Sequence, residues 1–561
     1  MKKRSFFGHY KTIFVNEFKG YNASKFLKDV LAGITVAAVA LPLAIAFGSS
    51  TVEGLGPSYT SFGVIAGMIT AIFAGLVMGA LGGGSFQISG PTGAMTVVLG
   101  SILAKNGVQG MFMATMLAGI ILLVAGLLRF GKLIQFIPRP VIVGFTSGIA
   151  VVIALGQLGN CFGIGLQGEN VVQKVVYLFQ HIQESNWKAI VLTVVATAII
   201  FIYPKKLSKY VPGSLVSLII VTLLCLIPGL NKGAVDTIGT IKGTLINSEV
   251  LNFKAINGEM LISLISPAFT IAVLGMIESL LCGVCASKMK NEPFDSNVEL
   301  VAQGVGNIVI PFFGGVPATA AIARTAVAVK SGGQTRITSI MQSIVLIVCI
   351  FALPSVIAII PKAALAGVLF ATAWKMNEWK AIKEYFSKKK IEAIILYIVT
   401  LVCTVLLDLT YAILIGVVLS LIIMVINTKV KIEVSPIEKK YLNINETKDT
   451  AIVYVTGSLF FANAGELEKQ VKLIINNFEN FIFVFRGVTY LDVSSIEALT
   501  EMIEMLNTNN KQYEFTGVSE NIYKKLEKDG FTKLVGEQNF YKSLDRLLLK
   551  DDGISQFIEK E

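Results

Sequence analysis

Residues 311–336 read PFFGGVPATAAIARTAVAVKSGGQTR, and the rest of the chain is best understood from this stretch. Gly314–Pro317 breaks the chain, and a helix is expected to begin at Ala318, because proline is tolerated in a helix's first turn. The first N–H groups of a helix lack intrahelical partners, and its N-terminus carries partial positive charge. Arg324 would lie six residues further on, about 9 Å along the axis. The stretch therefore predicts an anion site at a helix N-terminus, with an arginine nearby.

The composition is typical of a membrane protein. Of 561 residues, 54% are hydrophobic and 15% are charged, and the mean hydropathy is +0.70. Residues 1–28 are polar and basic, so we expect no cleavable signal and a first membrane span directly after them. The net charge of +11 is attributed to lysines in cytoplasmic loops and not to nucleic-acid binding. We find no nucleophile–base pair, metal cluster, cofactor fingerprint or ATP motif, so we expect neither an enzyme nor a cofactor beyond a coupling ion.

The apolar runs predict about fourteen membrane spans between residues 29 and 428. The third and tenth runs, near 91–103 and 318–330, are too short to cross a bilayer, and each follows glycine and proline. Lysines and arginines gather in alternate loops, most densely from Lys375 to Lys390, which favours an even number of spans with both termini in the cytoplasm. Residues 1–28 would then be a cytoplasmic segment, residues 29–428 a transport domain and residues 429–561 a cytoplasmic domain.

The membrane part contains an internal repeat, at about 29–230 and 263–428. Residues 89–95 (SGPTGAM), in the third span, resemble residues 316–321 (VPATAA), in the tenth. The two are offset by seven spans, an odd number, so the halves have opposite orientations. Short interrupted segments at matching positions of inverted repeats are typical of a transporter's binding site. In this alignment only the second half is charged: Glu278 stands opposite Leu43, and Arg324 opposite Val98.

The two charged residues of the second half allow more than one interpretation. Glu278 lies within an apolar span, where burial disfavours the ionised carboxylate and a nearby arginine favours it. Such a group could carry a coupling proton or ligate sodium. The alternative is structural, with Arg324 paired permanently to Glu278 or to a helix carbonyl, although intramembrane ionisable residues are usually functional. Asp29, near a span end, is interpreted as a cap or a solvated loop residue.

Several motifs, in this order, are similar to those of the SulP family of anion transporters. They are DVLAGITVA at 29–37, LPLAIAF at 41–47, SGPTG at 89–93, IESLL at 277–281, residues 297–306 and residues 314–325. The resemblance implies a polytopic α-helical fold with a seven-plus-seven inverted repeat, divided into core and gate domains, usually a homodimer in the cell membrane. It also implies transport of sulfate, bicarbonate or carboxylates. The family's substrate residues correspond here to Phe47, Thr92, Gly93, Ala94, Ala318, Thr319, Ala320 and Arg324.

Two departures from the family bear on the coupling ion. Sodium-coupled bicarbonate members carry aspartate at the position of Glu278 and threonine at that of Cys282. A thiol is a poorer sodium ligand than a hydroxyl, so Glu278 and Cys282 favour coupling to protons over sodium. The expected function is proton-coupled symport of an inorganic oxyanion, sulfate first and bicarbonate next. A sodium-coupled bicarbonate symporter, an anion channel or exchanger, and a dicarboxylate transporter remain as alternatives.

From about residue 429 the hydropathy falls and the pattern changes. Residues 451–455 and 481–485 are expected to be buried strands, and residues 465–477 and 494–506 helices, which predicts an α/β domain. This part resembles STAS domains, and the resemblance implies a protein partner for it. Residues 491–496 (LDVSSI) match a loop that is a phosphoserine site in some relatives, with Ser494 as the candidate. Asp492 and Ser494 suit a helix N-cap equally well.

Overall fold

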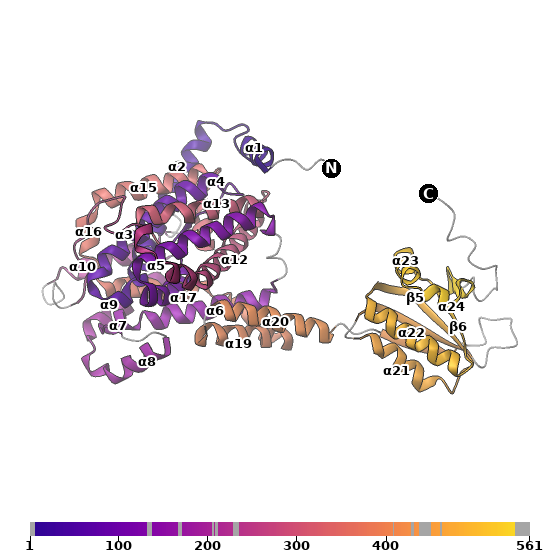
Figure 1. Cartoon of the computed structure of the whole chain (residues 1–561). Helices are drawn as coiled ribbons and strands as arrows, with labels where there is room; N and C mark the ends of the chain where they lie inside the picture. Colours follow the sequence, from indigo (N-terminus) through magenta and orange to yellow (C-terminus); the bar gives the residue numbers. More distant parts are fainter. Residues whose placement is uncertain are drawn as a thin grey trace. The chain divides into compact units, whose positions relative to one another are not determined.

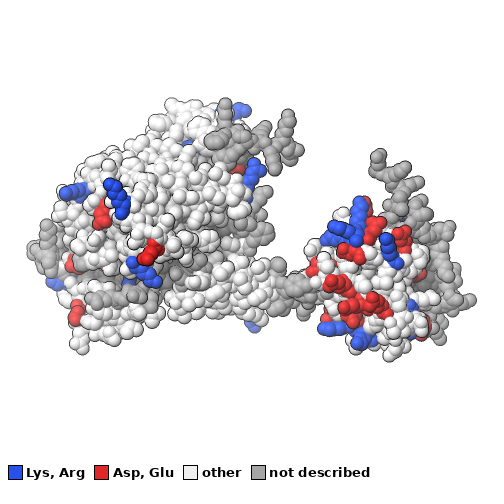
Figure 2. All heavy atoms as spheres, in the orientation of Figure 1, with Lys and Arg blue, Asp and Glu red and all other residues white. Residues whose placement is uncertain are grey.

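The polypeptide forms two units (Figure 1): a helical unit, Met1–Val418, and a unit that contains the α/β domain, Leu419–Glu561. The computed structural model describes residues 6–131, 137–166, 171–204, 207, 211–227, 235–407, 409–427, 431–436, 450–460 and 463–544. Charged side chains are sparse on the face of the helical unit in Figure 2, whereas both signs are dense on the α/β unit. This contrast is typical of a membrane part joined to a water-exposed part.

The helical unit consists of long and shorter apolar helices. Its first half contains α1 (Phe6–Glu17), α2 (Ala23–Thr51), α3 (Thr60–Phe73), α4 (Gly79–Leu81), α5 (Gly93–Leu127), α6 (Arg139–Gly156), α7 (Leu158–Phe162), α8 (Val171–Gln180), α9 (Trp187–Ile202) and α10 (Gly213–Leu224). Its second half contains α11 (Gly258–Ser263), α12 (Ile265–Lys290), α13 (Ser296–Val309), α14 (Ile322–Lys330), α15 (Ile337–Ala352), α16 (Pro354–Ala358), α17 (Lys362–Met376), α18 (Trp379–Ser387), α19 (Ile391–Leu406) and α20 (Leu409–Asn427).

The length and composition of these helices suit a lipid bilayer. Within the described residues, five stretches are long and apolar enough to cross it: Ala23–Thr51, Thr60–Leu81, Gly93–Leu127, Arg139–Phe162 and Gly258–Lys290. Helices α9, α10, α15 and α19 are apolar but shorter. Helix α5 holds the third and fourth expected spans. Gly107 separates them with a φ of +63°, a left-handed conformation that glycine adopts most readily.

Contacts between the two halves of the helical unit come in equivalent pairs, in which a contact of a first-half helix with the second half is matched by a contact of its second-half counterpart with the first half. Helix α2 of the first half packs on α15 of the second, and α12, the counterpart of α2, packs on α5. Likewise α6 packs on α19, and α17, the counterpart of α6, packs on α9. Helices α2, α5, α12 and α15 thus form a first helix group, and α6, α9, α17 and α19 form a second. This is the arrangement expected of an inverted repeat divided into core and gate.

Two short strands lie in the middle of the first helix group. Strand β1 (Ser89–Gly90) pairs antiparallel with β2 (Thr319–Ala320), with Ser89 opposite Ala320 and Gly90 opposite Thr319. The expectation that a helix begins at Ala318 is therefore wrong, because α14 begins at Ile322, four residues later. The side chain of Asn307 on α13 explains the difference. It accepts from the Ala318 N–H at 2.8 Å and donates to the Ala318 carbonyl at 2.9 Å, which keeps this backbone out of a helix.

The later helix start also changes how the two repeats correspond. Helix α5 begins at Gly93, after Thr92 in its N-cap position, and α14 begins at Ile322. Counted from these first residues, Arg324 is the third residue of its helix and corresponds to Met95. The sequence alignment that placed Arg324 opposite Val98 is therefore out of register by three residues.

The second unit has the α/β architecture that its sequence predicts. Its sheet runs β3 (Lys431–Pro436), β4 (Thr450–Leu459), β5 (Asn480–Leu491), β6 (Gln512–Thr516) and β7 (Phe540–Tyr541), parallel from β4 to β7 and with β3 antiparallel to β4. Its helices are α21 (Ala464–Ile474), α22 (Val493–Thr508), α23 (Glu520–Lys528) and α24 (Phe531–Val535). Phenylalanines of the central strands, Phe483 and Phe515, are fully buried and stack at a centroid distance of 5.1 Å.

Candidate anion-binding site

The two interrupted segments meet at neighbouring residues of α12. Thr92, just before α5, donates a hydrogen bond to the Glu278 carboxylate at 2.9 Å. The hydroxyls of Ser279 and Thr319 are 2.8 Å apart. Because Glu278 and Ser279 are consecutive, α12 contacts both segments within one helical turn. The two segments are thus brought together at α12, and β1–β2 pairing joins Ser89 and Gly90 of the first directly to Thr319 and Ala320 of the second.

Arg324 is the most unusual side chain of this region. It lies in the first turn of α14 and is only 1% exposed. Its Nη2 donates to the carbonyl of Pro91 at 2.9 Å. Its Nε and Nη1 are buried and have no hydrogen-bond partner among the described residues. A buried donor without an acceptor costs about 1–3 kcal/mol, and more when the group is charged.

The structure decides between two earlier interpretations of Arg324. Within the described residues, no ion pair joins Arg324 to Glu278, so a permanent salt bridge between them is wrong. Nη2 does donate to a carbonyl, but Pro91 lies between β1 and α5 and not in a helix, so pairing with a helix carbonyl is wrong as well. Gly90 of β1 lies against the guanidinium, because a Cβ built there would collide with Nη1. The guanidinium therefore lies against the bare backbone of Gly90 through Nη1, and both Nη1 and Nε lack an acceptor in the described part of the chain.

The helix starts supply further N–H donors beside Arg324. The first hydrogen bond within α14 runs from Thr325 N–H to the Ala321 carbonyl at 2.9 Å, and that of α5 from Thr96 to Thr92 at 3.1 Å. The N–H groups of the first three residues in each helix therefore have no acceptor inside the helix. In α5 these include the predicted residues Gly93 and Ala94.

The predicted backbone donors of the second half need correction. The N–H of Ala318 donates to Asn307, and that of Ala320 donates to the Ser279 hydroxyl at 3.2 Å. Neither N–H is therefore free for an anion, and the donors move to Ile322–Arg324 at the start of α14. The local sequence is rich in alanine and suits a helix, so only the tertiary contacts of Asn307 and Ser279 reveal this shift.

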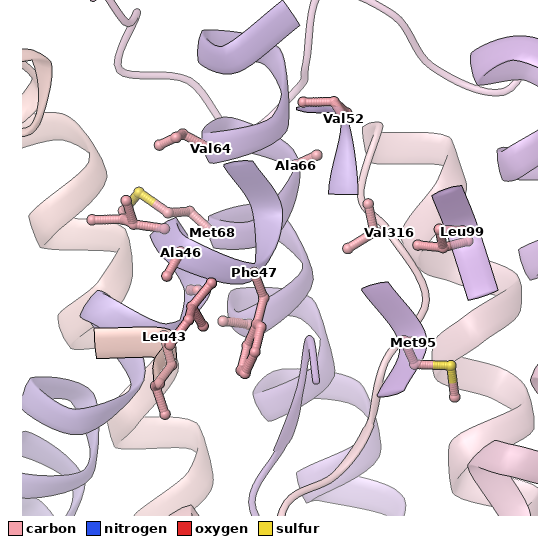
Figure 3. Close-up of a cluster of buried hydrophobic side chains, with 14 of the residues drawn as sticks. Leu43, Ala46, Phe47, Val52, Val64, Ala66, Met68, Met95, Leu99 and Val316 are labelled. Carbon is pink, nitrogen blue, oxygen red and sulfur yellow. The ribbon is translucent and has the colours of Figure 1, made fainter. Parts of the chain in front are cut away.

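Phe47 forms the apolar side of the site. Its ring is 4% exposed, and a Cβ built on Gly93 would lie 3.1 Å from its Cε1. Figure 3 shows Phe47 among buried side chains of α2, α3 and α5, with Met95 and Leu99 of α5 and Val316 nearby. The start of α5 is thus packed against this ring and against Ile153 of α6, whose Cδ1 would collide with a Cβ at residue 93, so glycine is the residue that this spacing permits.

Glu278 and Cys282 lie one helical turn apart on α12. Glu278 keeps partial exposure in the middle of an apolar helix, whereas Cys282 is 1% exposed. The thiol of Cys282 lies 3.2 Å from the Thr325 hydroxyl of α14, which in turn accepts from the N–H of Ile88 at 3.0 Å. Both residues therefore contact the elements that carry the anion donors. No cluster of three or more metal-ligating side chains occurs among the residues searched.

A polar stripe on α13 supports the strands, and sequence reasoning missed it. Glu299 accepts from the Gly83 N–H at 2.9 Å and from Gln303 at 2.8 Å. Gln303 also donates to Ser89 of β1 at 2.8 Å, and Asn307 holds Ala318 as described above. All three are at most 1% exposed. Their spacing of four residues within an apolar span was the signal that could have found them.

The N-terminal segment holds the turn that follows α14. Glu17, at the end of α1, accepts from the Arg336 backbone N–H at 2.7 Å and from its guanidinium at 2.6 and 2.8 Å. These side chains are 5% and 2% exposed. Arg336 also donates to the Ala80 carbonyl at the end of α4. Residues distant in sequence are thus fixed at one point beside the end of the arginine-bearing helix.

Asp29 fixes the same turn from α2. It is fully buried, so the expectation of a solvated loop residue is wrong. Its carboxylate accepts from the N–H groups of Gln334 and Thr335 at 2.6 and 3.0 Å, and from the hydroxyls of Thr335 and Thr338 at 2.7 and 2.8 Å. The two N–H groups belong to the turn before α15, whose N-cap residue is Arg336, so the expectation that Asp29 caps a helix is wrong as well.

Sequence and structure comparisons agree with this architecture. The model of the sulfate permease family matches residues 26–399, and that of the STAS domain matches residues 441–547. The chain belongs to the sulfate permease family. It is 31% identical over 543 residues to "Putative sulfate transporter YvdB" of Bacillus subtilis, covering 95% of this chain and 99% of that protein. It is 28% identical to the "Bicarbonate transporter BicA" of Picosynechococcus, covering 89% and 90%.

Solved structures of this family share the fold. One is the transmembrane domain of a cyanobacterial bicarbonate transporter BicA, which is 29% identical to this chain and has a TM-score of 0.63. The match covers 70% of this chain and 98% of the BicA chain. Murine Slc26a9, an anion transporter in the inward-facing state, is 17% identical, with a TM-score of 0.83 over 98% of this chain and 95% of its own. The protein is therefore a multi-pass membrane anion transporter with a STAS domain, and it is not an enzyme.

Proposed function

We propose that the protein is a secondary active transporter of an inorganic oxyanion, which binds between the starts of α5 and α14. The observation that carries this proposal is the guanidinium of Arg324, which is buried with two donors that no acceptor in the described part of the chain satisfies. A tetrahedral or planar oxyanion offers several acceptor oxygens to such a group and to the N–H groups beside it. Sulfate is our first candidate and bicarbonate our second, because relatives carry both names.

Glu278 is the proposed carrier of a coupling proton. Its carboxylate is bonded to Thr92, next to the anion donors, and keeps partial exposure. A proton taken up there would remove the negative charge that disfavours an approaching anion. The neighbouring Cys282 offers a thiol where a sodium site would need a hard oxygen ligand.

Sodium-coupled bicarbonate symport is the alternative that an observation favours. Glu278 accepts from the hydroxyl of Thr92, and the hydroxyl of the next residue, Ser279, contacts that of Thr319. Hydroxyl and carboxylate oxygens are ligands that suit sodium. An anion channel, an exchanger or a dicarboxylate transporter would use the same scaffold and are separated by the following measurement.

Uptake of radiolabelled sulfate or bicarbonate into proteoliposomes tests the proposal. An inward proton gradient without sodium is expected to drive accumulation above the outside concentration, and a protonophore is expected to abolish it. Dependence on sodium with no effect of the protonophore would replace the proton by sodium. Equilibration without accumulation would indicate a channel, and uptake only against internal anion would indicate an exchanger.

Ser494 is proposed as a regulatory phosphorylation site. In the STAS unit Asp492 caps α22 and accepts from the N–H and hydroxyl of Ser495 at 2.9 and 2.6 Å, so Ser494 is not needed as a cap. Ser495 is 1% exposed, whereas Ser494 is only partly buried. Intact-mass measurement of the purified protein and of the Ser494→Ala variant is the test. A phosphate that survives in the variant would exclude Ser494.

The wider arrangement follows from the family and is also a proposal. We place the N-terminal segment, residues 1–28, and the STAS domain, from residue 429, both in the cytoplasm. The transport domain at 29–428 lies between them in the sequence, and we expect a homodimer in the cell membrane. A protein partner of the STAS domain fits the same scheme. Labelling of single cysteines from each side and cross-linking in membranes test the orientation and the dimer.

A further inference from the structure

Helix α18 lies where two membrane helices begin. One face of it, with Ala381 and Tyr385, is buried against Val143 near the start of α6 and Tyr397 near the start of α19. Only residues 377–390 separate the end of α17 from the start of α19. The short connection and these contacts keep α18 at the level of the helix starts. The helix therefore lies at the boundary between lipid and water.

Helix α18 and the end of α17 also carry exposed aromatic rings. Trp374, Trp379 and Phe386 are 55%, 46% and 47% exposed. The two indoles lie 4.5 Å apart, and the Trp379 N–H donates to the Trp374 carbonyl at 3.0 Å. Tryptophan with an apolar ring and a polar N–H is the residue favoured at the level of lipid headgroups. An exposed indole pair at this boundary therefore indicates contact with lipid and not with bulk water.

The same segment is strongly basic. Between Trp374 and Ile391 the sequence holds six lysines and two glutamates. Both acids are already paired: Glu378 with Arg139 at 3.0 Å, and Glu384 with Lys388 and Lys390 at 3.1 and 2.9 Å.

Three other lysines of the segment add to this positive surface. Lys380, Lys383 and Lys389 are exposed, and they have no ion-pair partner in the described part of the chain. A surface with surplus positive charge beside indole rings is complementary to phosphate groups that lie at headgroup depth.

We propose that α18, with its flanking residues 374–391, binds the headgroups of anionic phospholipids. The lysines contact the lipid phosphates, and Trp374 and Trp379 lie at the glycerol level beside them. The occupant is a lipid and not a free phosphate ion, because a soluble ion gains nothing from the exposed indoles. The proposal is independent of which anion is transported. The competing explanation is that these lysines only orient the chain during insertion, which requires no preference for any headgroup.

Tryptophan fluorescence reports on this surface selectively. The chain has three tryptophans, Trp187, Trp374 and Trp379, so Trp187→Phe leaves only the two reporters. The full chain is placed in nanodiscs of mixed phosphatidylcholine and phosphatidylglycerol, in which either lipid carries bromine on its acyl chains. At equal mole fraction, brominated phosphatidylglycerol is expected to quench the tryptophan fluorescence about twofold more than brominated phosphatidylcholine. The reason is that the lysines attract phosphatidylglycerol to the lipid positions beside the two indoles.

Matched lysine variants complete the test. Lys380→Gln/Lys383→Gln/Lys389→Gln is expected to equalise the two lipids while quenching by phosphatidylcholine persists. The control Lys105→Gln/Lys242→Gln/Lys254→Gln removes the same charge at positions outside this segment and should keep the preference. Equal quenching in the parent, or a preference that survives the first triple variant, would overturn the proposal. Absence of quenching by either lipid would indicate that protein and not lipid covers the surface, and would overturn the proposal as well.

Discussion

Replacing Arg324 by methionine should weaken anion binding while leaving the empty protein at least as stable. The wild-type side chain makes one hydrogen bond, from Nη2 to Pro91, and leaves Nε and Nη1 buried without acceptors. Losing the one bond costs about 1–3 kcal/mol, and removing two unsatisfied donors returns about 1–3 kcal/mol each. Replacing a buried charge by an apolar side chain of similar volume is often neutral or stabilising by about 1–4 kcal/mol. The anion-free variant should therefore unfold at the same temperature or higher.

The effect on binding has the opposite sign. An oxyanion at the site would accept from both free nitrogens of Arg324, and a hydrogen bond to a charged group contributes about 1.5–3 kcal/mol. The loss in Arg324→Met is then about 3–6 kcal/mol, or roughly 10²–10⁴-fold in affinity. Arg324→Lys keeps the charge without the planar fork and should fall between the two.

Thermal unfolding in detergent with increasing sulfate or bicarbonate measures both effects together. An anion at about 100 times its Kd stabilises the wild type by about 2.7 kcal/mol, and the methionine variant should show no such shift. Sodium chloride at equal ionic strength is the control for screening. An anion-dependent shift that persists in Arg324→Met would refute the assignment, and so would a variant that unfolds in the absence of anion well below the wild type.

Three further changes probe the surroundings of the site. Gly90→Ala places a methyl group against Arg324 Nη1 and should cost at least about tenfold in anion affinity, read by the same titration. Glu278→Gln keeps an acceptor for Thr92 but cannot carry a proton, so uptake into proteoliposomes should lose its dependence on the proton gradient, and an unchanged pH profile would exclude a proton role. Glu17→Gln leaves the buried Arg336 charge unpaired and should destabilise by about 3–5 kcal/mol in thermal unfolding, whereas Glu17→Gln with Arg336→Met should lose less than the sum of the single variants.

The class of fold and the residues near the site could be predicted from the sequence. Hydropathy located the membrane helices, and the two isolated charges, Glu278 and Arg324, stood out because apolar spans rarely tolerate them. The motif at 89–93 and its partner at 314–325 predicted that two interrupted segments would meet. In the structure they meet at α12, where Thr92 contacts Glu278 and Thr319 contacts Ser279.

The backbone at 318–321 could not be predicted, because its conformation depends on distant side chains. Alanine-rich sequence favours a helix, but Asn307 and Ser279 bind the backbone of Ala318 and Ala320 and keep them extended. The start of α14 therefore moves to Ile322. This shift puts Arg324 in the first turn, beside the free N–H groups, and not six residues away from them.

The role of the N-terminal segment was also absent from sequence reasoning. Glu17 is separated from Arg336 by more than half of the chain, and neither residue lies in a recognisable motif. Asp29 stands within one, but its partners are backbone groups of a turn three hundred residues away, which no local pattern indicates. Contacts of this kind depend on how the two repeats pack and need a three-dimensional structure.

The most direct test of the anion site is a map of the protein in nanodiscs at saturating concentration of its transported oxyanion. We expect density within hydrogen-bond distance of Arg324 Nε and Nη1, in contact with the N–H groups that begin α5 and α14. Density bound elsewhere, with both nitrogens of Arg324 paired to protein acceptors, would contradict the account.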